Sequence, residues 1–103
     1  MNPTLKESMI LQDADLLEST GAISIMRACS SSGQMGRPLY NLEDPFCKNQ
    51  KPQKVSFGLD LFYVRLLKAK DKVHTKTAKI IAKRRTNFLR NFLKELSLEL
   101  KGK

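Results

Sequence analysis

The sequence contains no tryptophan, a single histidine and only two cysteines among its 103 residues. Cys29 and Cys47 have no second cysteine pair and no clustered histidines near them, which argues against a zinc site. Nothing in the spacing resembles a disulfide scaffold, and neither residue lies in a motif for nucleophilic catalysis. We therefore expect two reduced thiols.

Long apolar runs are also missing. No segment approaches the roughly 20 apolar residues needed to span a bilayer. The N-terminus lacks the basic region followed by an apolar stretch that is typical of a secretory signal. These absences predict a soluble, cytoplasmic protein that is not attached to a membrane. With 103 residues, 41% of them hydrophobic and 28% charged, the chain has room for one globular domain with a small core.

Acidic residues are scarce in the C-terminal half. The net charge is +9 overall, but residues 1–50 sum to −2 and residues 51–103 to +11. Such a field attracts nucleotides or nucleic acid without sequence preference. Many of the cations fall on one expected helix, namely Lys79, Lys83, Arg84, Arg85 and Arg90. They form either a surface for non-specific nucleic-acid binding or a solvated outer face, which is the commoner role of such charges.

The apolar pattern predicts helices in the N-terminal part. Residues 4–7, Thr-Leu-Lys-Glu, fit a capping box, so a helix should begin near residue 5. Apolar residues at helical spacing continue past Gly21 to Met26. The serine-rich run 30–33 favours turns over helix interiors and should end this helical region. A long irregular loop should then extend to about residue 56.

A helical hairpin is predicted for the C-terminal part. Five of its apolar residues repeat at amphipathic helical spacing: Leu59, Phe62, Tyr63, Leu66 and Leu67. A first helix should therefore run from Gly58 to Asp71. Thr75 can cap a second helix of about 26 residues, with Phe88 and Phe92 in its core-facing stripe. The two helices should pack as an antiparallel pair.

Three carboxylates lie within the first apolar helical pattern: Asp13, Asp15 and Glu18. An ionised carboxylate removed from water needs a cation, a metal or several hydrogen-bond donors. Asp15 and Glu18 are three positions apart and share a helix face, whereas Asp13 points elsewhere. The pattern predicts that Asp15 is the inward-facing acid. The alternative is a partly exposed Asp15 paired with a lysine or arginine.

Two further polar sites stand out. The segment Gly36–Tyr40 places Arg37 beside a rigid turn, which suits bidentate contact with a phosphate. Alternatively, Arg37 pairs with a carboxylate and Tyr40 covers the core. His74, at the start of the last expected helix, has no partner nearby in sequence and is expected to be a surface residue rather than a catalytic base.

Several of these segments resemble the C-terminal half of an HD-domain metal-dependent phosphohydrolase, a member of the HD-superfamily hydrolases. The matching segments, in the family's order, are Gln12–Leu17, Gly21–Ile23, Gly36–Tyr40, Phe62–Asp71, Thr75–Arg85, Phe88 and Phe92–Leu93. The resemblance implies one partial HD-like domain over residues 1–103. In it, residues 1–30 form the helix with the Asp15 motif, 31–56 a loop and 57–103 a helical hairpin.

The resemblance also implies a divalent metal, Mn or Mg. The family holds it with a His, a His-Asp doublet and a later Asp that corresponds to Asp15. No His-Asp doublet occurs in this sequence, and His74 is followed by Thr75. The helices that carry the other ligands are expected before Met1. We therefore expect that this chain alone does not hold the metal.

Four residues are candidates for supporting roles. Asp13 and Glu18 would orient metal ligands or a water, or they are ordinary solvated or salt-bridged acids. Arg37 and Tyr40 are candidates for contact with phosphate. Intact relatives would hydrolyse phosphate ester or anhydride bonds, with nucleotides as the substrate class, and this chain would be inactive alone.

Two kinds of protein partner follow from these expectations. A complementary N-terminal HD half is expected, and uncovered apolar faces would favour homo-oligomers. The competing interpretation of the chain is a basic helical nucleic-acid-binding or protein-interaction module.

Overall fold

The structure is a computed structural model that describes residues 6–49, 51–52 and 57–103. Across these residues all regular structure is helical: α1 (Lys6–Leu17), α2 (Gly21–Met35), α3 (Asp60–Val64), the 3₁₀ helix η1 (Leu66–Asp71) and α4 (Lys76–Leu100). The predicted all-α class is confirmed. The proposed capping box lies partly outside the described residues.

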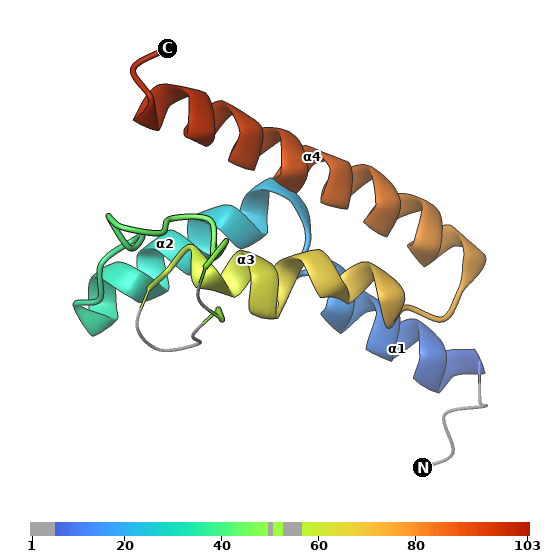
Figure 1. Cartoon of the computed structure of the whole chain (residues 1–103). Helices are drawn as coiled ribbons and strands as arrows, with labels where there is room; N and C mark the ends of the chain where they lie inside the picture. The colour runs from blue at the N-terminus through green and yellow to red at the C-terminus, as the bar shows by residue number, and fades with distance from the viewer. Residues whose placement is uncertain (1–5, 50, 53–56) are drawn as a thin grey trace.

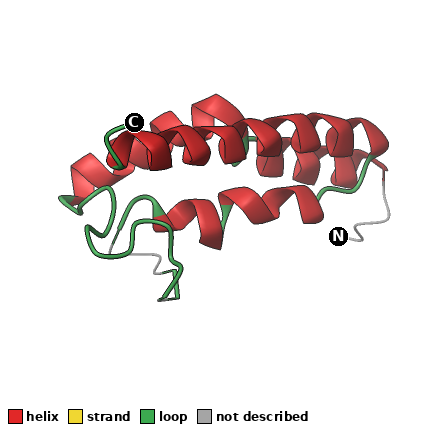
Figure 2. Cartoon of the chain, turned by 45° about the horizontal axis from the view of Figure 1, so that its top comes forward, coloured by secondary structure: helices red, strands yellow, loops and turns green. Residues whose placement is uncertain are grey.

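The chain crosses the length of the molecule three times (Figure 1). Helices α1 and α2 follow one another from one end to the other, α3 and η1 return, and α4 runs back along both. Figure 2 shows the same arrangement after rotation, with the irregular loop at the end where α2 finishes. None of the described helices has the length and apolar character of a membrane span.

Helix α2 continues through the serine-rich run, so the prediction that this run ends the helix was wrong. The Ser32 hydroxyl donates to the Ala28 carbonyl at 2.8 Å, within the helix itself. A serine bonded in this way no longer competes for other backbone groups. The helix ends instead at Gly36, whose left-handed backbone, with φ 69°, suits glycine. The irregular segment therefore starts after Met35 rather than at residue 31.

The predicted hairpin is confirmed, with one change in its first arm. That arm is divided into α3 and η1 by Arg65, whose φ of −127° and ψ of −55° lie outside the helical range. The second arm, α4, has 25 residues and begins where predicted. The Thr75 hydroxyl accepts the backbone N–H of Ala78 at 3.2 Å, which satisfies one of the free donors at the start of the helix.

Two apolar clusters hold the helices together. Leu59, Phe62, Leu66 and Leu89 form the larger one, against which Phe92 packs. The rings of Phe62 and Phe92 stack with centroids 5.6 Å apart. The smaller cluster, Val73, Ala78 and Ala82, is covered by Leu16 and Leu17 of α1.

Three apolar residues expected to continue buried helical stripes are on the surface. Phe88 is 48% exposed, so its predicted core position was wrong, while Ile23 and Met26 are 68% and 71% exposed. Phe88 precedes the fully buried Leu89 on α4, and consecutive helical residues point about 100° apart. The register that buries Leu89 therefore turns Phe88 outward.

Candidate functional site

The buried acid of α1 is Asp13 and not Asp15, the reverse of the predicted orientation. Asp13 is 3% exposed, and its carboxylate accepts the backbone N–H groups of His74 and Thr75 at 2.6 and 2.8 Å. Burial alone would raise the pKa of Asp13, but these two hydrogen bonds, the Thr75 side chain and the charge of His74 together leave the pKa below its ordinary value. Asp13 therefore serves as a clamp between α1 and the start of α4.

Asp15 is exposed and lines a hollow of 390 Å³ on the opposite side of α1 from this clamp. The hollow lies where the α1–α2 corner faces the break between α3 and η1. Its polar lining comprises Asp15, Glu18, Ser19, Ser24, Arg27, Ser31 and Arg65. The structure thus gathers an acid that the sequence singled out with two arginines that it did not. We call this hollow the Asp15 site.

The two arginines of the Asp15 site differ in their partners. Arg27 donates to Glu18 at 3.0 Å, and both side chains are about two-thirds exposed. An exposed pair of this kind contributes about 0–1 kcal/mol and is easily exchanged for another anion. The Arg65 guanidinium makes no hydrogen bond or ion pair with any described residue. The Arg65 guanidinium is therefore available to form a bidentate pair of hydrogen bonds with a phosphate.

The Asp15 site does not by itself fit a divalent metal. In the part of the chain that the structure describes, no three His, Cys, Asp or Glu side chains are grouped so that they can hold an ion. Asp15 and Glu18 supply carboxylates, but Glu18 is occupied by Arg27. Since divalent ions need several oxygen or nitrogen ligands, the described residues are an incomplete donor set.

Arg37 and Tyr40 lie outside the Asp15 site. The Arg37 Nε donates to the Ser32 hydroxyl at 2.9 Å, which ties the loop to the end of α2. Tyr40 packs against the larger apolar cluster, as the alternative interpretation expected. His74 is exposed at the start of α4, as expected, and its Nε2 is 2.8 Å from the Gln12 side-chain oxygen.

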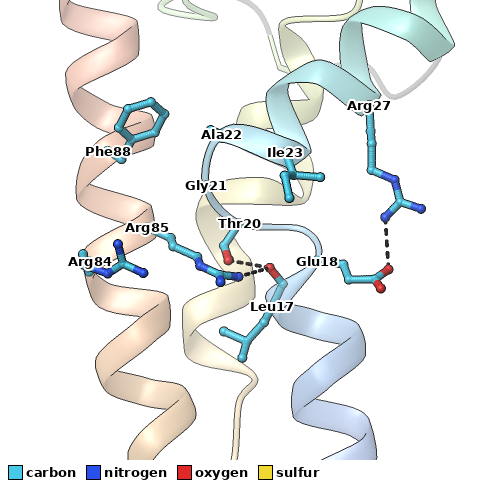
Figure 3. Close-up of a pocket in the computed structure, with 10 residues that line it drawn as sticks. All are labelled: Leu17, Glu18, Thr20, Gly21, Ala22, Ile23, Arg27, Arg84, Arg85 and Phe88. Carbon is cyan, nitrogen blue, oxygen red and sulfur yellow. Dashed lines mark hydrogen bonds and ion pairs between the residues drawn. The ribbon is translucent and has the colours of Figure 1, made fainter.

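A second and larger hollow of 690 Å³ lies on the other side of the α1–α2 corner, against α4 (Figure 3). It shares Glu18 and Arg27 with the Asp15 site, and two of its other polar side chains are bonded to the backbone. Arg85 donates to the Leu17 carbonyl at 3.1 Å, and the Thr20 hydroxyl donates to the same oxygen at 2.6 Å. These bonds satisfy a carbonyl at the end of α1, so Arg85 is a structural residue rather than a free phosphate ligand.

Both cysteines are free thiols, as expected. The Cys47 thiol donates to the buried Asp60 carboxylate at 3.2 Å. Burial, this hydrogen bond and the nearby charges of Asp60 and Asp44 raise the pKa of Cys47 to about 12. A thiol of such a high pKa is overwhelmingly protonated near neutral pH.

Sequence reasoning missed Arg27 and Arg65. Arg65 lies between the apolar residues 62–63 and 66–67, so the helical spacing predicts that its side chain points away from the core. Its nearness to Asp15 depends on how η1 packs against α1, and no local pattern contains that information.

Comparison with known proteins reveals relatives in sequence and in fold. No family model matches the chain. YpgQ of Bacillus subtilis, an uncharacterized protein, is 32% identical over 100 residues, which cover 97% of this chain and 43% of YpgQ.

Several solved structures share the fold. An HD-superfamily hydrolase from Bacillus thuringiensis has a TM-score of 0.79 at 32% identity, covering 94% of this chain and 47% of its own. YpgQ in complex with ADP has a TM-score of 0.75 at 29% identity, with coverages of 94% and 45%. The Lin1889 protein of Listeria innocua has a TM-score of 0.77 at 37% identity, with coverages of 95% and 49%. The chain therefore spans about half the length of the relatives it matches.

Proposed function

Because this chain has the helical fold of one part of an HD-superfamily hydrolase, we propose that it is the portion of an HD-type phosphohydrolase that carries Asp15 and binds the phosphates of a nucleotide. The observation that carries this proposal is the Asp15 site itself. It combines the acid that the family resemblance singles out with two arginines in one hollow. The ADP-bound YpgQ structure supports a nucleotide as the ligand class.

The role of each residue in the Asp15 site follows from the hydrogen bonds and ion pairs that it makes within the chain. Arg65 has no partner for its guanidinium among the described residues, so this group is available for the terminal phosphate of a nucleotide. Arg27 can exchange its exposed bond to Glu18 for a second phosphate contact. Asp15, also exposed, is positioned to contribute one carboxylate to the reaction centre.

We propose that hydrolysis requires residues beyond this chain. The HD family uses a divalent metal, Mn or Mg, and the resemblance assigns it four ligands, of which only Asp15 is present. Since the described residues form an incomplete donor set, the chain alone should bind nucleotide without turning it over. The relatives are about twice as long, and a partner with the complementary part of the HD domain would supply the remaining ligands.

Nucleotide binding tests the first part of this proposal. We expect the 103-residue chain to bind ADP in a calorimetric titration, and Arg65→Gln to weaken binding about tenfold, because a charge-assisted hydrogen bond contributes about 1.5–3 kcal/mol. Arg84→Gln is the matched control, since Arg84 is an exposed arginine that lines the other hollow. Equal losses in the two variants, or no ADP binding at all, would contradict the assignment of the site.

Reconstitution tests the second part. The chain should show no hydrolysis of nucleotides with Mn²⁺ or Mg²⁺, and activity should arise when a complementary HD segment is joined to it. Asp15→Ala should then abolish turnover, while ADP binding through Arg65 persists. Full activity of the reconstituted Asp15→Ala variant would refute the role of Asp15.

A further inference from the structure

One side of α4, beside its buried face, carries a row of cations. Lys76, Lys79, Lys83, Arg90 and Lys94 are spaced three, four, seven and four residues apart, so they lie along one side of the helix, with Asn87 between them. We call these five residues the basic stripe. It extends from Lys76 to Lys94, a span of 19 residues that corresponds to about 27 Å of helix.

The basic stripe lacks the acidic residues that normally offset the positive charges on a solvent-exposed helix face. No acid occurs in α4 before Glu95, and all five stripe residues are exposed. In the described part of the chain, none of the five makes an ion pair or side-chain hydrogen bond. Like charges four residues apart, such as Lys79 and Lys83, repel each other and destabilise a helix slightly. An anionic partner would turn this repulsion into attraction.

The middle of the stripe also borders a concave surface. A hollow of 310 Å³ lies between η1 and α4, lined by Lys79, Lys83, Asn87 and Arg90 on one side and by Lys70 and Asp71 on the other. Asp71 is already neutralised by Lys70, whose ammonium group is 3.2 Å from its carboxylate. No carboxylate among the described residues that line the groove is therefore paired with the cations of α4. A groove with cations along it is the usual shape of a surface that follows a nucleic-acid backbone.

The chemistry of the groove specifies which part of a nucleic acid it fits. No aromatic side chain lines it, so bases have nothing to stack on. The nearest aromatic along α4, Phe88, lines the other large hollow instead. Lysine acts as a point charge suited to phosphate, and phosphate contacts carry no sequence information.

We propose that the basic stripe binds the phosphodiester backbone of duplex nucleic acid without sequence preference. This surface is separate from the Asp15 site: no residue of the stripe lines the Asp15 hollow. The inference is therefore independent of the proposed phosphohydrolase role.

Fluorescence anisotropy with the full chain and a labelled 20-base-pair duplex of mixed sequence tests the proposal. Log affinity should fall linearly with log salt, with a slope of about −4.5 if all five cations contact phosphate. Lys79→Gln, Lys83→Gln and Arg90→Gln, combined in one variant, should reduce that slope to about −1.8 and weaken binding at low salt at least about tenfold.

A charge-matched variant separates a site from a general charge effect. Lys48→Gln, Lys51→Gln and Lys103→Gln, combined in a second variant, remove the same charge from exposed positions outside α4. This variant should keep the wild-type slope. Equal losses in both variants would overturn the proposal, as would the absence of binding at 25 mM salt. Tight binding to phosphatidylglycerol vesicles without binding to the duplex would also overturn it, in favour of a membrane surface.

Discussion

At the scale of single residues, the acid that matters for stability is Asp13. Its two oxygens accept backbone N–H groups from His74 and Thr75, which precede the first turn of α4. A negative charge near the start of a helix also interacts favourably with the helix dipole. Asp13 therefore combines two charge-assisted hydrogen bonds with a favourable field, and it joins segments 61 residues apart in sequence.

Replacing Asp13 should reveal this contribution. We expect Asp13→Ala to lower the free energy of unfolding by about 2 kcal/mol, because two partly buried donors lose their acceptor. Asp15→Ala is the matched control. It removes an exposed acid from the same helix and should change the free energy by less than about 0.5 kcal/mol. Urea unfolding monitored by far-UV circular dichroism measures both, and equal effects would contradict the clamp.

The same clamp predicts a pH dependence. The pKa of Asp13 is lower in the folded chain than its ordinary value of 3.8, so the folded state favours the ionised form. The stabilisation is complete above pH 3.8 and is lost as the pH falls through the folded pKa. The stability difference between wild type and Asp13→Ala should therefore shrink below about pH 3.8, and a constant difference down to pH 2 would contradict this.

At the scale of elements, the loop between α2 and α3 is fixed by a close approach at Gly58. The backbone N–H of Gly58 donates to the Pro38 carbonyl at 2.9 Å, which brings the two ends of the loop together. A Cβ at position 58 would overlap the hydroxyl of Ser32, which is fully buried. Only glycine lets the returning chain pass this close to α2.

Gly58→Ala should therefore destabilise the chain by about 1–3 kcal/mol, the usual cost of overpacking. Gly33→Ala is the control, because Gly33 lies within α2 and a Cβ there meets nothing within 4 Å. It should stabilise the chain by up to about 1 kcal/mol through better helix propensity. Thermal unfolding of the two variants checks the contrast, and two changes of the same sign would refute it.

The helices also show which structural features could be predicted from the sequence and which could not. The bounds of α4 and the hairpin followed from spacing and from the Thr75 cap, because both signals are local. The end of α2 did not, since Ser32 bonds within its own helix instead of forming a turn. The orientations of Asp13 and Asp15 were reversed because helical spacing places residues on faces without saying which face is buried. Packing of α1 against α4 decides that.

At the scale of the whole molecule, charge is separated along the chain. The first 50 residues sum to −2 and the remainder to +11, and much of the positive charge lies on α4. Two ion pairs occur among the described residues, Arg27 with Glu18 and Lys70 with Asp71, and neither involves α4. The cations of α4 up to Lys94 thus repel one another in the folded state, with no ion pair among the described residues to offset them, and such self-repulsion destabilises a compact chain.

Added salt should screen this repulsion between the cations of α4 and so stabilise the folded chain. We expect the Tm of the free chain to rise by a few degrees when NaCl increases from 20 to 500 mM, since the Debye length shortens from roughly 20 Å to about 4 Å. The two exposed ion pairs weaken under the same change, but they contribute too little to reverse it. Lys79→Gln, Lys83→Gln and Arg90→Gln in one variant should raise the Tm at low salt and flatten its salt dependence. A wild-type Tm that falls with NaCl would show that attraction, and not repulsion, dominates the charges of this molecule.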